Sequence, residues 1–125
     1  MRKTELDDRV RFIEQQGMRV LQLDFSHATA AQMIALLKRV KDTVAQQTPK
    51  SVIVLANYEG AEIDHDVAMK IKEVLTLDRP FIKKAAWIGT ADIPNALMEN
   101  FHFFSQRETV TFKTREEALD WLVKD

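Results

Sequence analysis

Two short stretches of this sequence place residues side by side whose side chains carry out chemistry in many proteins. Ser26 precedes His27, so a hydroxyl nucleophile stands beside a base. Adjacent side chains rarely face one another, and the sequence has no G-x-S-x-G elbow, so we predict no catalytic pair here. Asp64, His65 and Asp66 are metal-ligand types. On one helical turn they would point in different directions, whereas ligand pairs stand three or four residues apart, so no metal site is predicted.

A third stretch, Gly-Thr-Ala-Asp at positions 89–92, is partly similar to a phosphate-binding loop because it precedes a predicted helix. It lacks the second glycine and the lysine of such loops, and Asp92 would repel an anion. Nucleotide binding is therefore not predicted, and no cofactor is expected. The sequence contains no cysteine, which excludes disulfides, thiolate metal sites and a cysteine nucleophile.

Polar residues follow three of the predicted strands at the point where each strand ends. In open α/β sheets, ligands and partners bind in the crevice beyond the carboxyl ends of parallel strands. The sequence therefore predicts a partner-binding loop rim at this edge of the sheet, made by Ser26, His27, Asn57, Tyr58, Glu59, Thr90 and Asp92. The alternative is that Ser26, Thr90 and Asp92 only cap helices and that the other side chains are solvated.

The loop rim depends on a strand at positions 52–56, Val-Ile-Val-Leu-Ala. A short, unbroken apolar run is typical of a strand that is covered on both faces in the middle of a parallel sheet. Thr29, Asp64 and Thr114 are suited to cap the helices that follow them. Strands are predicted at 9–15, 18–25, 52–56, 81–89 and 109–112, and helices at 30–47, 64–78, 93–105 and from 115 onward.

This order, ββαβαβαβα, predicts a single α/β domain over residues 9–125. Strands that alternate with helices give a mixed, mainly parallel five-stranded sheet flanked by about four helices. The strand at 9–15 is the more polar member of the first pair and is predicted at the edge of the sheet. Residues 1–8 form a polar lead that is predicted to be flexible.

Composition restricts the class of protein. A length of 125 residues suits one domain with its own core. The 18 Lys and Arg residues balance 19 Asp and Glu residues, which argues against a general nucleic-acid binder. No apolar run approaches the ~20 residues of a membrane-spanning helix, and the charged start MRKTELDDR lacks a signal segment. A cytoplasmic location is expected.

Three pieces of the chain, taken in order, carry a family resemblance. They are DFSHAT at 24–29, RPFIK at 79–83 with AWIG at 86–89, and FKTREEALDWL at 112–122. Together they resemble the SpoIIAA-like family, a bacterial branch of the STAS superfamily whose fold is shared with lipid-binding Sec14-type (CRAL-TRIO) domains. The resemblance implies a non-enzymatic module that acts by contact with a protein partner. The Sec14 likeness implies an alternative, a carrier or sensor of a small apolar ligand.

The sequence departs from the family at one functional position. STAS domains of the anti-sigma antagonist type carry a phosphorylatable serine at the start of the helix after the central strand. Here residues 52–75 contain neither serine nor threonine, and Tyr58 has the only hydroxyl group. A Ser/Thr phosphorylation switch is therefore not expected at this site.

The predicted helix that ends near position 105 is unusually apolar. At 100° per residue its apolar side chains spread over about 220°, whereas one sheet covers a stripe of little more than ~100°. Three explanations are open: a homodimer interface, an apolar ligand cavity bounded by the last helix and the sheet, or cover from the last helix itself. The residues assigned to this association surface or apolar pocket are Met98, Phe101, Phe103, Phe104 and Trp121.

Overall fold

The computed structural model describes the whole chain except residues 107–109 and 125. The strands are β1 (Val10–Gln15), β2 (Met18–Asp24), β3 (Val52–Asn57), β4 (Ile82–Ile88) and β5 (Val110–Phe112). The helices are α1 (Lys3–Arg9), α2 (Ala30–Val44), α3 (His65–Asp78), α4 (Asn95–Ser105) and α5 (Arg115–Leu122). From β1 onward this is the predicted order of elements.

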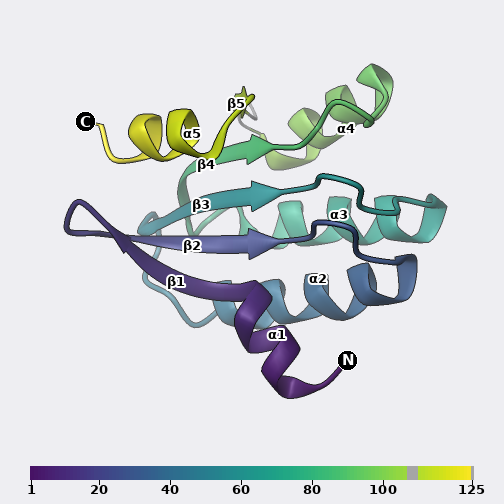
Figure 1. Cartoon of the computed structure of the whole chain (residues 1–125), viewed down its shortest axis with the longest axis horizontal. Coiled ribbons are helices and arrows are strands. Elements are labelled where there is room, and N and C mark those ends of the chain that lie inside the picture. Colours follow the sequence, from purple (N-terminus) through teal and green to yellow (C-terminus); the bar gives the residue numbers. More distant parts are fainter. Residues whose placement is uncertain (107–109, 125) are drawn as a thin grey trace.

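The five strands form one mixed sheet in the order β1-β2-β3-β4-β5 (Figure 1). β1 pairs with β2 in the antiparallel sense, and the other three pairings are parallel. β1 lies at an edge, as its polar sequence predicts, and β3 lies in the middle. Residues 52–56 of β3 are all buried, which confirms that this strand is covered on both faces.

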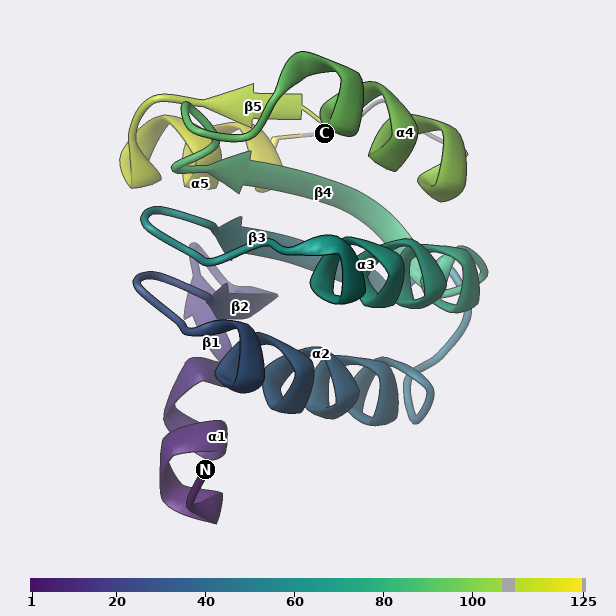
Figure 2. The ribbon, with the colours of Figure 1, turned by 90° about the vertical axis from the view of Figure 1, so that its right-hand side faces the viewer.

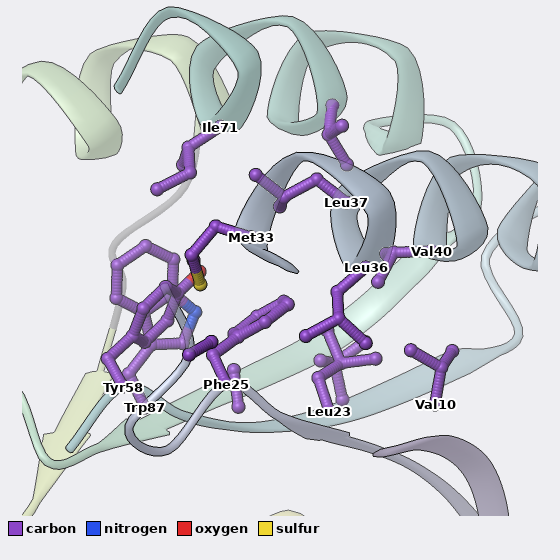
Figure 3. Packing of buried hydrophobic residues seen from close by; sticks show 14 of the residues in the cluster. Val10, Leu23, Phe25, Met33, Leu36, Leu37, Val40, Tyr58, Ile71 and Trp87 are labelled. Carbon is purple, nitrogen blue, oxygen red and sulfur yellow. The ribbon is translucent and has the colours of Figure 1, made fainter. Parts of the chain in front are cut away.

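The two faces of the sheet are covered unequally. α2, α3 and α4 lie along one face, and α5 lies on the opposite face (Figure 2). The larger core cluster fills the space between the sheet and α2 and α3, and Figure 3 shows part of it. The smaller cluster joins α5 to the inner strands through Ala118, Leu119 and Leu122.

The caps that start the helices follow from single polar side chains. Thr29 and Gln32 form the predicted reciprocal capping box at the start of α2. The Asp64 carboxylate accepts a bond from the Val67 amide at 2.8 Å. The Thr114 hydroxyl accepts from the Glu117 amide, as the predicted capping box at the start of α5 requires. The Glu117 carboxylate accepts from the Thr114 hydroxyl at 3.1 Å, whereas a reciprocal box would have it accept from the Thr114 amide.

α2 ends three residues before the predicted position 47. After Val44 the amides of Gln46 and Gln47 bond carbonyls three residues back, to Thr43 and Val44. Bonds of this spacing form the tighter turns that commonly close an α-helix.

α1 is the one helix that the sequence does not predict, because residues 1–8 read as a flexible lead. None of its residues is buried, and only Leu6 packs partly against the core, so it shows no apolar stripe. Two polar contacts also hold it: Asp7 pairs with Arg39 of α2, and Arg9 donates to the carbonyl of Ser26 at 3.0 Å. A helix this short depends on such tertiary contacts rather than on its own propensity. No helix in the described part of the chain is long and apolar enough to cross a membrane.

Candidate functional site

The loops that follow β2, β3 and β4 are joined to one another by backbone hydrogen bonds. The amide of Phe25 donates to the carbonyl of Asn57 at 2.9 Å, and the amide of His27 donates to that of Glu59 at 2.7 Å. The Tyr58 amide in turn bonds the carbonyl of Ile88 at 3.0 Å. Three segments that are far apart in sequence therefore form one continuous edge, as the parallel sheet requires (Figure 2).

Two glycines allow the loops to approach this closely. Gly60 and Gly89 both have left-handed backbone conformations, with φ of 65° and 69°. A Cβ atom at Gly60 would lie 2.3 Å from Nδ1 of His27, and one at Gly89 would lie 2.5 Å from the amide nitrogen of Glu59. The positive φ favours glycine at both positions, and at Gly89 the contact with the backbone of Glu59 requires it as well.

The exposed side chains of the loop rim are His27, Glu59 and Asp92, whereas Ser26, Asn57 and Thr90 are half-buried. Two of the half-buried residues form local turns. The Ser26 hydroxyl donates to the Asp24 carboxylate at 2.6 Å, and the Asn57 side-chain oxygen accepts from the Glu59 amide at 3.0 Å. These two side chains therefore shape the loops: Ser26 bonds Asp24 and does not cap α2, whose N-cap is Thr29.

Tyr58 is not part of the exposed rim, and the prediction that it opens to solvent is wrong. Only 5% of its surface is exposed. Its ring centroid lies 5.0 Å from that of Phe25 and 4.5 Å from that of Trp87. Figure 3 shows these three rings together with Met33 among the core residues.

The cause is the period of two in a strand. Val52, Val54 and Ala56 of β3 point into the larger core cluster, and Tyr58 belongs to the same cluster. The hydrogen bond from its amide to Ile88 continues the parallel pairing by one residue. Residue 58 therefore faces α2 and α3 rather than the solvent.

A polar cleft of about 230 Å³ adjoins the loop rim on the face of the sheet that carries α5. Gln22, Asp24, Asn57 and Arg115 contribute its polar lining. The guanidinium of Arg115 donates to the side-chain oxygen of Gln22 at 2.7 Å. In the sequence Arg115 is only the residue after a helix cap, so its place beside the rim could not be predicted without the position of α5.

α4 is covered mainly by the sheet and α3. Phe101 is fully buried, with its ring 5.7 Å from that of Trp87, and Met98 packs partly against the same cluster. Lys72 of α3 lies 5.6 Å from the ring of Phe104. The side chain of Phe103 is 71% exposed. It is the large apolar side chain of α4 that the sheet and α3 leave uncovered, so it accounts for the unusually wide apolar surface of this helix.

Trp121 lies on the opposite face of the sheet from α4. It packs against Phe112 at 5.6 Å and beneath the ammonium group of Lys84 at 4.3 Å. Cover of α4 by Trp121 is therefore excluded, and so is a pocket shared by Phe101 and Trp121. α5 follows the edge strand β5 and folds back over the face that α4 does not occupy (Figure 2).

A cavity of about 60 Å³ lies instead between the sheet and the pair α2 and α3. Its walls are mostly apolar and include the aromatic rings of Phe25, Tyr58 and Trp87. Its polar lining residues are Tyr58, Asp78, Arg79 and Ser105.

Asp78, the last residue of α3, is the least expected of these residues. Only 9% of it is exposed, and burial raises the pKa of its carboxyl group to about 7. No described residue forms a hydrogen bond or an ion pair with this carboxyl group. Burial also raises the pKa of Tyr58, and the nearby charge of Asp78 raises it further, so the phenol stays neutral.

No protein-family model matches the chain, and no curated protein matches it. Among solved structures, the chain is similar to an anti-sigma-factor antagonist (STAS) domain protein from Planctomyces limnophilus. The TM-score is 0.61 at 12% sequence identity, over 92% of this chain and 98% of that chain. A likeness at this identity concerns the fold, and it confirms the STAS-type fold that the family resemblance implies.

Proposed function

We propose that this chain, whose fold is that of STAS domains, is a non-enzymatic module that binds a protein partner through the exposed part of its loop rim. The observation that supports this proposal is the set of backbone bonds that hold His27 and Glu59 side by side. A binding surface on fixed loops loses little conformational entropy when a partner docks. The similar structure is named as an anti-sigma-factor antagonist, a name that also refers to a protein target.

The charge of the rim indicates the chemistry of the partner. Glu59 and Asp92 of the rim and the neighbouring Glu62 are exposed carboxylates, and residues 57–66 contain no lysine or arginine. We therefore propose a partner with a basic or hydrogen-bond-donating surface, which such a rim would attract. We also propose that the contact is made in the cytoplasm.

A phosphorylation switch is not part of this proposal. The capping position of α3 is held by Asp64, whose carboxylate bonds the helix amide directly. With no serine or threonine between 52 and 75, we propose that binding at this edge does not depend on Ser/Thr phosphorylation there.

The rim is tested by in-cell cross-linking. A photo-cross-linking residue at position 59 is expected to give a discrete adduct with the partner. His27→Ala is expected to reduce the yield of that adduct about tenfold, because the loss of one useful contact costs ~1.4 kcal/mol of binding free energy. The same residue at Asp120, which is exposed on α5, is the matched control. Identical adducts from both positions, or none from position 59, would contradict the proposal.

We further propose that the chain forms a homodimer through α4, because Phe103 is a large aromatic side chain with 71% of its surface exposed. Phe103→Ser is expected to weaken the dimer ~10- to 100-fold, as removal of an aromatic interface residue does. Sedimentation velocity over a concentration series measures this. Ile34→Ser, at an exposed apolar position on α2, is the control. A wild-type chain that stays monomeric at high concentration would refute the dimer.

A second candidate function is a carrier or sensor of a small ligand, and the cavity beneath α2 and α3 supports it. A volume of about 60 Å³ exceeds several times the ~10–15 Å³ that one water molecule needs. It suits a compact ligand of a few non-hydrogen atoms rather than a lipid chain. Native mass spectrometry of the purified chain would detect such a ligand as a defined added mass.

A further inference from the structure

The cavity between the sheet and α2 and α3 contains an acid without a partner. Asp78 lines it, is nine-tenths buried, and has no hydrogen bond or ion pair with any described residue. The Tyr58 side chain lines the same space and likewise forms no hydrogen bond with the described part of the chain. No described side-chain polar atom is both fully enclosed and without a hydrogen-bond partner, so the oxygens of Asp78 and Tyr58 keep some accessible surface. Because both residues line the cavity, a ligand placed there would contact both groups.

The charged groups at this cavity do not neutralise the acid. Arg79 of the α3 C-terminus is the one cation among the lining residues, and its Nε atom donates to the carbonyl of Phe104 at 2.6 Å. The pKa of Asp78 is nevertheless raised, and burial is the cause. The remaining titratable group at the cavity is Tyr58, which is a neutral phenol.

The other walls fit a cation as well. Phe25, Tyr58 and Trp87 line the cavity together, with neighbouring ring centroids 5.0 Å and 4.5 Å apart. Aromatic rings attract organic cations through their negative faces, and the attraction is strongest where water is excluded. Aliphatic residues of α2 and α3, among them Leu37, Val40 and Ile71, close the opposite side.

We propose that this cavity binds a small organic cation, an amine or quaternary ammonium group, with Asp78 as its counter-ion and the three aromatic rings as its walls. The proposal rests on the second candidate function and assigns it a site and a chemical class of ligand. A ligand with a carboxylate or phosphate group is disfavoured, because Asp78 would repel it. A neutral ligand would leave the ionised acid unpaired, at the cost that a buried charge carries.

Two probes of equal size separate charge from shape. Tetramethylammonium and tert-butanol each have five non-hydrogen atoms, and only the first is a cation. Each is titrated into the full-length chain while the amide signals of residues around the cavity are followed by NMR at pH 8. Tetramethylammonium is expected to bind with a dissociation constant of ~1 mM or tighter, and tert-butanol at least ~10-fold more weakly.

The variant Asp78→Asn removes the charge and keeps the shape. It is expected to weaken tetramethylammonium binding at least ~30-fold and to leave tert-butanol binding within about threefold of wild type. In wild type the affinity for the cation is expected to fall between pH 8 and pH 5, because protonation of Asp78 removes the counter-ion. Asp78→Asn is expected to abolish that dependence.

The outcomes distinguish the two proposals. Equal binding of both probes, unaffected by Asp78→Asn, would overturn the cation site while leaving a small-ligand function in place. No binding of either probe would overturn the cation site, and a bare mass in native mass spectrometry would then remove the small-ligand function as well.

Discussion

Asp78→Asn is expected to stabilise the protein at pH 8 by about 2–4 kcal/mol, an unusually large gain for one substitution. The cause is the environment of the carboxyl group at the end of α3. It is 9% exposed and unpaired with any described residue, and burial raises its pKa from 3.8 to about 7. At pH 8 the folded protein must ionise this group inside an apolar cavity. An asparagine amide has nearly the same shape and carries no charge.

The sign of the pH dependence follows from proton linkage. Between its unfolded and folded pKa values, near 4 and 7, the folded state binds more protons at Asp78 than the unfolded state does. The contribution of this group to stability is therefore full below about pH 4 and is lost as the pH rises through about 7. Between pH 5 and pH 8, wild type is expected to lose about 2–3 kcal/mol more than Asp78→Asn.

Urea unfolding of both proteins at pH 5, 6.5 and 8 measures this difference. Both proteins contain the same three histidines, so any effect of those residues cancels in the comparison. Asp120→Asn, at an exposed position on α5, is the matched control and is expected to show no such effect. Parallel pH profiles for wild type and Asp78→Asn would show that the carboxyl group is not desolvated in solution.

A buried acid that destabilises its own fold at neutral pH is typical of functional sites. Sites that bind charged ligands keep groups that the folded chain alone does not satisfy, and the ligand restores the lost stability. The proposed cation would restore the stability that ionised Asp78 costs the fold.

The loop rim differs from the cavity, because its half-buried polar groups Ser26 and Asn57 already form hydrogen bonds within the chain. The cavity and the rim therefore suit different ligands, a small molecule and a protein surface.

The fold could be predicted because local signals agree with the tertiary arrangement. The apolar run of β3 indicates a central strand, and the caps at Thr29, Asp64 and Thr114 mark where three helices begin. α1 has no comparable signal. Its stabilising partners, Arg39 and the Ser26 carbonyl, are more than ten residues away in sequence, so no local pattern reveals them.

The site could be predicted only in part. The edge of the sheet where the loops gather follows from parallel topology, but the direction of each side chain does not. The position of Tyr58 in the core could have been predicted from β3. Its inward-facing residues alternate, and the same alternation carried two residues past Ala56 reaches Tyr58. For Asp78, the spacing from Val67, Ile71 and Val74 continues the apolar stripe of α3 and would have placed the acid on the inner face.

The cavity itself could not be predicted from the sequence. It is lined by residues of three helices and three strands, whose separation depends on how the side chains pack rather than on any motif. For the same reason the exposed ring of Phe103 and the buried ring of Phe101 read alike in the sequence, although they stand only two residues apart on α4.

Gly89→Ala is expected to destabilise the protein by about 3 kcal/mol or more. Part of the cost, ~1–2 kcal/mol, comes from placing a side chain on a backbone with φ of 69°. The rest comes from contact, because the new Cβ would lie 2.5 Å from the Glu59 amide nitrogen and 2.7 Å from Oδ1 of Asn57. The amide nitrogen belongs to the backbone of the neighbouring loop, so it cannot rotate away as a side chain would.

Gly17→Ala separates these two contributions. Gly17 in the turn between β1 and β2 has φ of 79°, but no atom lies within 4 Å of its added Cβ. Gly17→Ala is therefore expected to lower the free energy of unfolding only by the ~1–2 kcal/mol of backbone strain. Urea unfolding of both variants gives the difference, and a loss in Gly89→Ala no larger than in Gly17→Ala would show that the loops move apart freely. Because the contact displaces Glu59, Gly89→Ala is also expected to lower cross-linking from position 59, while Gly17→Ala leaves it unchanged. If Gly89→Ala lowered stability but left cross-linking from position 59 unchanged, the packing of the loop rim would not control partner binding.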